Sequence, residues 1–182
     1  MSKTVKWTVI IAAVLGIGAY VALKFMKVQT KQASPEVEQT YIVGDLTAVL
    51  HYSRPSKKGR VIFGSLVPFG KVWRTGANEA STISFNESIT FGGTAVPAGT
   101  YTLWTTPGAD QWSVYLNKKM YGWGIDFDGN AMRDPLEDVA VAKVTPQTLT
   151  TPVELFSISV GGTPATLVLE WDLTRIEVPL DQ

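Results

Sequence analysis

Residues 7–23 form an apolar stretch without a charged side chain, and this stretch sets the first limit on how the chain can fold. Lysines bracket it on both sides: Lys3, Lys6, Lys24 and Lys27. A helix of these 17 residues would rise about 25 Å, close to the ~30 Å hydrocarbon layer of a bilayer. Lysine and Trp7 are side chains that settle at membrane interfaces. The stretch therefore predicts one transmembrane helix, a signal anchor within residues 1–27.

A cleaved signal peptide is the main alternative, because it has the same basic beginning and apolar middle. The segment Ile17-Gly18-Ala19 is an acceptable cleavage context, but it lacks an Ala-x-Ala site and lysines follow it. We therefore favour an uncleaved, single-pass anchor in the cytoplasmic membrane, with secretion after cleavage as the alternative. Positive charges on the two sides are nearly balanced, and a short N-terminal tail usually stays inside. The domain that follows is expected in the periplasm or outside the cell.

Residues 28–40 are polar, contain Pro35 and show neither a helical nor a strand period. Such a stretch is typical of a linker. We therefore expect residues 28–40 to form a tether and residues 41–182 to form one folded domain. The length of that second segment suits a single domain with its own hydrophobic core.

Turn-forming residues lie almost entirely after the apolar stretch, with all ten prolines and 14 of the 16 glycines beyond residue 23. They divide the chain into short runs rich in β-branched and aromatic residues, without a long amphipathic helical pattern. The expected strands are residues 46–52, 82–85, 88–91, 101–105, 112–117, 138–144, 153–160, 165–171 and 175–178. This series predicts an all-β fold, an antiparallel β-sandwich or jelly roll preceded by one transmembrane helix.

Alternation within these runs predicts which side chains face the core. The residues expected there are Leu167, Leu169, Trp171, Trp112, Val114 and Leu116. Trp104 and Tyr115 fall on the opposite faces of their strands. We expect these two aromatic side chains at an outer surface, where they would stack a ligand or lie under a covering loop.

Charge is distributed unevenly along the chain. The first 31 residues carry five lysines and no acid, which leaves 11 basic and 16 acidic residues for the other 151. The net charge of −5 on that larger part disfavours general binding to nucleic acids. Cysteine is absent, which excludes disulfides, thiolate nucleophiles and zinc–thiolate sites.

Residues 52–80 form a long motif that reads YSRPSKKGRVIFGSLVPFGKVWRTGANEA. Further motifs follow in order: PAGTYTLWTTP at residues 97–107, Trp112 with Asn117, and Trp123-Gly124. Together these segments resemble the motifs of a bacterial family defined only as a domain of unknown function, over roughly residues 43–180. The resemblance implies an exported or membrane-attached β-rich domain, common in Bacteroidetes-like bacteria, and it implies no reaction. The chain departs from the family pattern at residues 126–137, where its loop is longer and more acidic.

The segment from Arg54 to Arg74 contains six basic residues and no acid, and it leads directly to Asn78 and Glu79. Arginine binds carboxylate, sulfate or phosphate groups through two parallel hydrogen bonds. Arg54 and Arg74 are therefore candidate ligands for an anion, with Asn78 and Glu79 binding hydroxyl groups beside it. The favoured alternative is a scaffold, in which Arg74 pairs with Glu79 or bonds backbone carbonyls to hold an irregular connection.

Metal and nucleophile sites have little support in the sequence. His51 is the only histidine, which excludes centres with several histidines, and there is no Gly-x-Ser-x-Gly elbow. Residues 126–137 place acids or amides at positions 1, 3, 5, 9 and 12 of a calcium loop, but Ala131, Arg133 and Pro135 break the pattern. We expect an acidic hairpin loop and no catalytic residue, metal or cofactor, with weak calcium binding as the alternative.

The sequence favours a membrane-anchored extracytoplasmic β-domain that binds or organises material in the cell envelope without chemistry of its own. Two alternatives stay open. A hydrolase or lyase acting on glycans would use carboxylates such as Glu79, one of them with a raised pKa. A structural module would assemble with itself or with a neighbour through exposed strand edges. The expected partners are the bilayer and an anionic or carbohydrate ligand.

Overall fold

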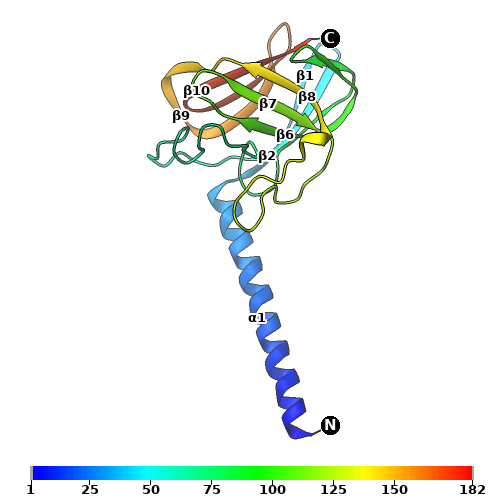
Figure 1. Ribbon diagram of the computed structural model, residues 1–182, viewed down its shortest axis with the longest axis vertical. Helices are drawn as coiled ribbons and strands as arrows, with labels where there is room; N and C mark the ends of the chain where they lie inside the picture. Colours follow the sequence, from blue (N-terminus) through cyan, green and yellow to red (C-terminus); the bar gives the residue numbers. More distant parts are fainter. Residues whose placement is uncertain (1, 182) are drawn as a thin grey trace. The chain divides into compact units, whose positions relative to one another are not determined.

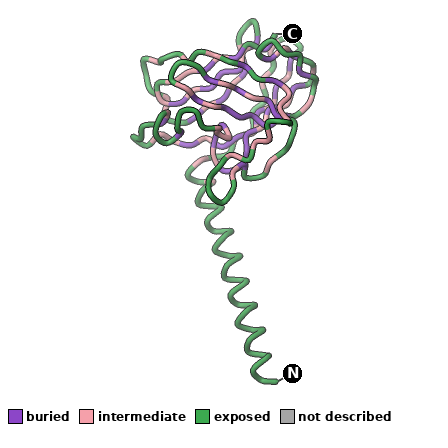
Figure 2. Tube along the Cα trace, in the orientation of Figure 1, coloured by how far each residue is buried: buried purple, intermediate pink, exposed green. Residues whose placement is uncertain are grey.

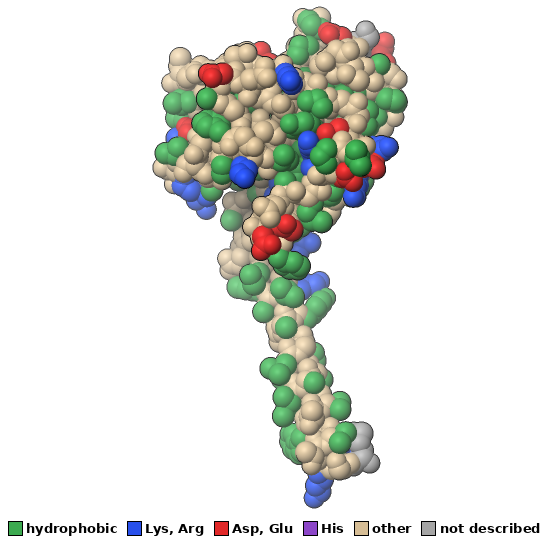
Figure 3. All heavy atoms as spheres, viewed as in Figure 1, with side chains coloured by type: hydrophobic (Ala, Val, Ile, Leu, Met, Phe, Trp, Pro, Cys, Tyr) green, Lys and Arg blue, Asp and Glu red, His purple; other side chains and the backbone are tan. Residues whose placement is uncertain are grey.

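A computed structural model describes residues 2–181 and divides the chain into two compact units, one ending at Ala33 and the other beginning at Ser34. The first is a single helix, α1 (Lys3–Ala33), with 31 residues (Figure 1). None of its described residues is buried (Figure 2). Hydrophobic side chains lie along its whole length (Figure 3). The helix is long and apolar enough to cross a membrane, as predicted, a property that anchors share with signal sequences.

The segment after the apolar stretch differs from the expected tether. α1 continues to Ala33 because residues 27–33 are mostly straight-chain residues and alanine, which favour helix. It ends before Pro35, which disfavours helical backbone in the residue preceding it. β1 (Glu36–Val43) then begins and pairs with β2 (Leu46–Ser53). Residues 28–40 are therefore divided between a helix and a strand, and the folded unit begins at Ser34.

The second unit contains two antiparallel sheets (Figure 1). The larger has the strand order β1-β2-β3-β6-β7-β8, and the smaller has the order β5-β4-β10-β9. The remaining elements are β3 (Thr82–Phe85), β4 (Ile89–Phe91), β5 (Thr94–Val96), β6 (Gly99–Thr106), β7 (Trp112–Asn117), the 3-10 helix η1 (Pro135–Glu137), β8 (Asp138–Val144), β9 (Gln147–Gly161) and β10 (Thr166–Asp181). The predicted antiparallel sandwich is confirmed.

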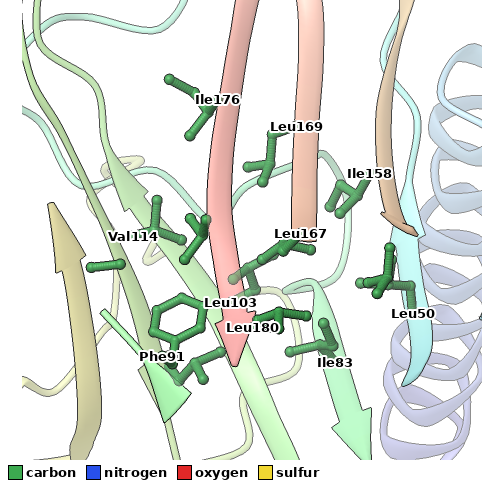
Figure 4. Close-up of a cluster of buried hydrophobic side chains, with 14 of the residues drawn as sticks. Leu50, Ile83, Phe91, Leu103, Val114, Ile158, Leu167, Leu169, Ile176 and Leu180 are labelled. Carbon is green, nitrogen blue, oxygen red and sulfur yellow. The ribbon is translucent and has the colours of Figure 1, made fainter. Parts of the chain in front are cut away.

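The hydrophobic core lies between the two sheets (Figure 4). Leu50, Leu103 and Val114 enter it from the larger sheet, and Ile158 and Leu169 enter it from the smaller one. The six residues expected in the core from alternation are all buried: Leu167, Leu169, Trp171, Trp112, Val114 and Leu116. Full burial of one aliphatic side chain contributes about 1.5–3 kcal/mol. Since α1 contributes no buried residue, the core of the second unit is complete without it.

The structure adds two strands that the sequence analysis does not predict. β1 is an edge strand of mostly exposed residues, so it lacks the apolar alternation that marks the other strands. β5 has three residues and joins β4 through Gly92 and Gly93, whose φ values of 57° and 82° favour glycine. The structure also joins the predicted runs 165–171 and 175–178 into β10.

Tyr52 gives the core a dependence on alkaline pH. Its hydroxyl donates to the Ile158 carbonyl at 3.2 Å and accepts from the Ile158 amide at 2.9 Å. Burial raises the pKa of Tyr52 above its ordinary value of 10.0. The neutral side chain therefore contributes stability that is fully present below pH 10 and is lost as the pH rises through the raised pKa.

We expect Tyr52→Phe to lower the free energy of unfolding by about 1–2 kcal/mol at pH 7, because the Ile158 amide loses this acceptor. The variant should also lose less stability than the parent between pH 9 and pH 12, a range set by ordinary tyrosine titration near 10. Urea unfolding at several pH values measures both effects. A variant whose stability falls with pH as steeply as that of the parent would contradict this assignment.

Candidate functional site

The four predicted site residues lie at the two ends of one long connection, residues 54–81, between β2 and β3. This segment forms no helix and only isolated bridges, and backbone hydrogen bonds fasten it to distant parts of the domain. These bonds are Arg54 N–H to Pro35 O (2.8 Å), Lys57 N–H to Glu154 O (2.8 Å), Gly70 N–H to Pro107 O (2.8 Å), Trp73 N–H to Thr105 O (2.7 Å) and Ala80 N–H to Gly122 O (3.0 Å). The connection thus follows a defined path although it is not part of a sheet.

Aromatic side chains hold the middle of this connection against the core. Phe63 packs edge-on against three tryptophans, with ring centroids 4.7 Å from Trp112, 6.0 Å from Trp73 and 6.1 Å from Trp171. Trp73 also stacks on Trp171 at 5.9 Å. Aromatic pairs at such separations contribute about 0.5–1.5 kcal/mol each beyond the area they bury. These contacts explain why the motif is rich in aromatic residues.

Arg54 bonds to the backbone of β9, and Asn78 bonds to groups next to the beginning of β1. The Nε atom of Arg54 donates to the Phe156 carbonyl at 3.1 Å. Asn78 is buried, and its Nδ2 atom donates to the Ser34 carbonyl and to the Ser53 hydroxyl, both at 3.3 Å. Asn78 has a φ of 58°, a left-handed conformation that asparagine tolerates better than most residues. These contacts fix the backbone path.

Arg74 and Glu79 form a second group together with Trp123. The guanidinium of Arg74 lies 5.7 Å from the centroid of the Trp123 ring, and its Nη1 atom donates to the Trp123 carbonyl at 3.0 Å. Burial lowers the pKa of Arg74, and the nearby charge of Glu79 opposes that change. The Trp123 side chain is 38% exposed. The guanidinium of Arg74 thus lies against an exposed aromatic ring and interacts with the charge of Glu79, whose Oε2 atom is buried.

The four predicted residues therefore contact different elements. Arg54 bonds to β9, and Asn78 bonds to β2 and to the start of the domain, whereas Arg74 bonds to Trp123 and interacts with the charge of Glu79. In the sequence Trp123 is part of a motif, and its contact with Arg74 is not predicted. Its position between Gly122 and Gly124 indicates that its side chain could be exposed, because a tryptophan in such a turn has no strand to bury it.

Trp104 and Tyr115 do not form an open aromatic surface, and the prediction that they stack a ligand is wrong. Trp104 is fully buried, with its ring 5.1 Å from that of Tyr121 in an edge-on contact. The guanidinium of Arg133 lies 3.9 Å from the centroid of the Tyr115 ring. Residues 118–137 thus cover the outer face of β6 and β7, the alternative that the sequence analysis left open.

The acidic side chains of residues 126–137 mainly bond to the loop itself. Asp126 accepts from the backbone amides of Asp128 and Asn130, and hydrogen bonds from Asn130 hold its pKa below the usual range. Asp134 caps η1 by accepting from the Leu136 amide at 3.1 Å. Among residues 2–181, no group of three or more histidine, aspartate or glutamate side chains is placed to hold a metal ion.

His51 and a surface hollow complete the set of candidate positions. The Nε2 atom of His51 lies 2.6 Å from a carboxylate oxygen of Glu36, across the β1–β2 ladder. The hollow lies over β9 and β10 and is lined in part by Arg175 and Glu177. Arg175 is bonded to Glu177 at 2.7 Å and to Glu170 at 2.6 Å, so its charge is already compensated. Arg74 also has a carboxylate nearby, Glu79, but its guanidinium lies against an exposed ring, so Arg74 is kept as the candidate ligand for an anion.

Residues 34–180 match the family model described as a protein of unknown function, DUF2911. The chain belongs to the DUF2911 family. The match begins where the second compact unit begins and covers both sheets, so the DUF2911 domain is the β-sandwich and excludes α1. Searches of curated proteins and of solved structures found no match.

Proposed function

We propose that this DUF2911 protein is a membrane-anchored binding module of the bacterial cell envelope, with its β-domain on the outer side of the cytoplasmic membrane. The observation that carries this proposal is the separation of α1 from the domain core. α1 is long and apolar enough to span a membrane and buries none of its described residues, whereas the sandwich buries its own core without it. A helix with this composition is costly to expose to water and is satisfied by a bilayer.

The group formed by Arg74, Glu79 and Trp123 supports a ligand class for this module, an acidic carbohydrate. The apolar face of a pyranose ring stacks on an exposed indole, and a uronic or muramic carboxylate pairs with a guanidinium. Arg54 and Asn78, whose contacts hold the connection in place, would position this group rather than bind the sugar.

Membrane anchoring is tested on the full chain expressed in a bacterial host. We expect the protein to remain in the membrane fraction after a high-salt or alkaline carbonate wash, with α1 still present by intact mass. Protease added to spheroplasts should degrade the domain, because it is expected outside. A soluble product that lacks the first residues by mass would instead identify α1 as a cleaved signal sequence.

Ligand binding is tested by thermal unfolding of the full chain in detergent with hexuronic-acid oligosaccharides, using neutral glucose oligosaccharides as the control sugar. A ligand at 100 times its Kd stabilises the folded state by about 2.7 kcal/mol, which raises Tm by roughly 5–10 °C in a domain of this size. Trp123→Ala and Arg74→Gln should each remove most of that shift. Phe127→Ala is the matched control, because Phe127 is a fully exposed aromatic residue in the same loop.

The outcomes separate the remaining alternatives. Equal shifts for Phe127→Ala and Trp123→Ala would contradict the assigned site. Release of shorter sugars during the incubation, abolished by Glu79→Gln, would identify a glycan hydrolase or lyase instead of a binding module.

A further inference from the structure

Residues 57–71, here called the basic loop, combine positive charge with exposed apolar side chains. The loop contains four basic residues and no acid: Lys57, Lys58, Arg60 and Lys71. Three large apolar side chains are exposed: Val61 at 68%, Leu66 at 45% and Phe69 at 47%. Basic residues interleaved with exposed apolar ones are typical of segments that bind at the surface of an anionic bilayer.

The backbone path of the basic loop determines which of its apolar side chains are exposed. Ile62 and Val67 point inward and are buried, which turns Val61 and Leu66 outward. The amide of Gly64 donates to the Val67 carbonyl at 2.9 Å, so the turn is closed by the backbone. Because Ile62 and Val67 belong to the hydrophobic core, the outward side chains are held in place and cannot all turn in at once. A preformed apolar surface binds with a smaller entropic cost than a mobile one.

Lys58 and Lys71 carry the charge that is most available to a partner, since the guanidinium of Arg60 donates to the carbonyls of Ser56 and Lys57 and interacts with the charge of Glu154. Lys57 pairs with Asp172 at 2.6 Å. Within residues 2–181, no salt bridge to an acidic side chain involves Lys58, Arg60 or Lys71. Glu154 lies at the base of the loop, where it accepts hydrogen bonds from the Ser56 hydroxyl and the Lys58 backbone amide.

Chain connectivity limits how far the start of the basic loop can lie from the end of α1. The Arg54 amide bonds to the Pro35 carbonyl at 2.8 Å, and the loop begins three residues after Arg54. Fully extended residues span at most ~3.6 Å each, so chain length alone keeps Lys57 within about 20 Å of Ala33. Lys27, which follows the apolar stretch, is six residues before Ala33, or about 9 Å along a helix. The basic loop is thus tethered within reach of the membrane surface.

We propose that the basic loop docks on the anionic phospholipid headgroups of the bilayer that holds α1. Val61, Leu66 and Phe69 enter the interfacial region, and the cationic side chains contact lipid phosphates. The anchor makes this second contact intramolecular, so a weak intrinsic affinity is sufficient. Docking would hold the sandwich against the membrane instead of leaving it to rotate about Ser34 and Pro35. This inference rests on the membrane anchoring proposed above.

The first test uses the full chain in lipid nanodiscs. Because the sequence has no cysteine, Ser65→Cys places one fluorophore at the exposed tip of the basic loop, and Ser88→Cys places one beyond β3, at the opposite end of the larger sheet. We expect a lipid-borne quencher to act at least about twice as strongly at position 65 as at position 88 in discs with anionic lipid, since interfacial segments enter by ~5–10 Å. Equal quenching at the two positions would overturn the proposal.

The second test separates docking from anchoring. Residues 34–182, whose core is complete without α1, are mixed with vesicles of phosphatidylglycerol and phosphatidylcholine and sedimented. Binding should fall with salt, and the double variant K58Q/K71Q should bind about 10- to 30-fold more weakly, since each basic residue near an anionic surface contributes roughly fivefold. The matched control K118Q/K143Q removes the same charge outside the loop and should bind as the parent does.

These results distinguish failure of docking from failure of anchoring. If residues 34–182 bind vesicles but α1 is cleaved in cells, docking stands and anchoring fails. If the full chain stays in the membrane but neither fragment nor loop label responds to anionic lipid, docking is wrong. Protection of the position 65 label that depends on protein concentration and not on lipid charge would assign the loop to a second copy of the chain, and would also overturn the proposal.

Discussion

Trp171→Ala is expected to lower the free energy of unfolding by about 4 kcal/mol, in the range found when large aromatic residues are removed from a core. Trp171 is 2% exposed and lies on β10, in the middle of the smaller sheet. Its ring stacks on Trp73 and meets the edges of Phe63 and Phe156 at 6.1 Å and 5.8 Å. Its Nε1 atom donates to the Glu154 carbonyl at 3.2 Å. The change thus releases the 54–81 connection as well as opening a cavity.

Urea unfolding followed by circular dichroism measures this loss. Trp171→Phe serves as a milder variant if the alanine variant does not fold, with an expected loss of about 1–2 kcal/mol from the missing volume and hydrogen bond. Trp123→Ala is the matched control, because that side chain is exposed and should cost well under about 1 kcal/mol. Similar losses at positions 171 and 123 would show that the aromatic cluster does not stabilise the connection.

Gly92→Ala is the second change with a large expected effect, a loss of about 3 kcal/mol or more. A Cβ atom at this position would lie 2.6 Å from the Cα atom of Ala142 and 2.7 Å from the carbonyl oxygen of Val141, both in the backbone of β8. Neither atom can move without disturbing the ladder between β7 and β8. Gly92 also has a φ of 57°, which alanine adopts only at a cost of about 1–2 kcal/mol.

Gly93→Ala is the matched control for this prediction. Gly93 lies in the same turn with a φ of 82°, but a Cβ atom there would meet nothing within 4 Å. This substitution should therefore lower the free energy of unfolding by only about 1 kcal/mol, because alanine must adopt the left-handed backbone conformation. Thermal unfolding of the two variants gives the difference directly. If both variants lose the same stability, the close approach of the β4–β5 turn to β8 is wrong.

Much of this fold is predictable from local patterns. Trp112, Val114 and Leu116 alternate with more polar neighbours, and the same period marks Leu167, Leu169 and Trp171, so both strand bounds and inward faces follow from the sequence. β1 escapes prediction because an edge strand buries little, and its polar residues look like a linker. Its strand identity comes from pairing with β2, which depends on tertiary contact.

The candidate site was less predictable, for a physical reason. A basic segment without acids shows where positive charge is concentrated along the chain. It does not show which distant groups accept hydrogen bonds from those basic side chains. Arg54 bonds to a carbonyl about a hundred residues away, and Arg74 meets Trp123 across another loop. Trp104 is a second example. Alternation predicts that its side chain points to the outer face of β6, but residues 118–137 cover that face and bury the side chain. When a loop covers the face of a sheet, the hydrophobic periodicity of the strand and of the loop does not reveal it.

The position of β10 has a consequence for how the protein is made. Residues 166–181 come last among the described strands, yet β10 lies between β4 and β9 in its sheet. Until residues 166–181 have been synthesised, the β4–β5 hairpin and β9 have no strand between them, so the smaller sheet cannot form. Because domains fold as units once their parts have emerged, the sandwich forms only after its last strand has been synthesised.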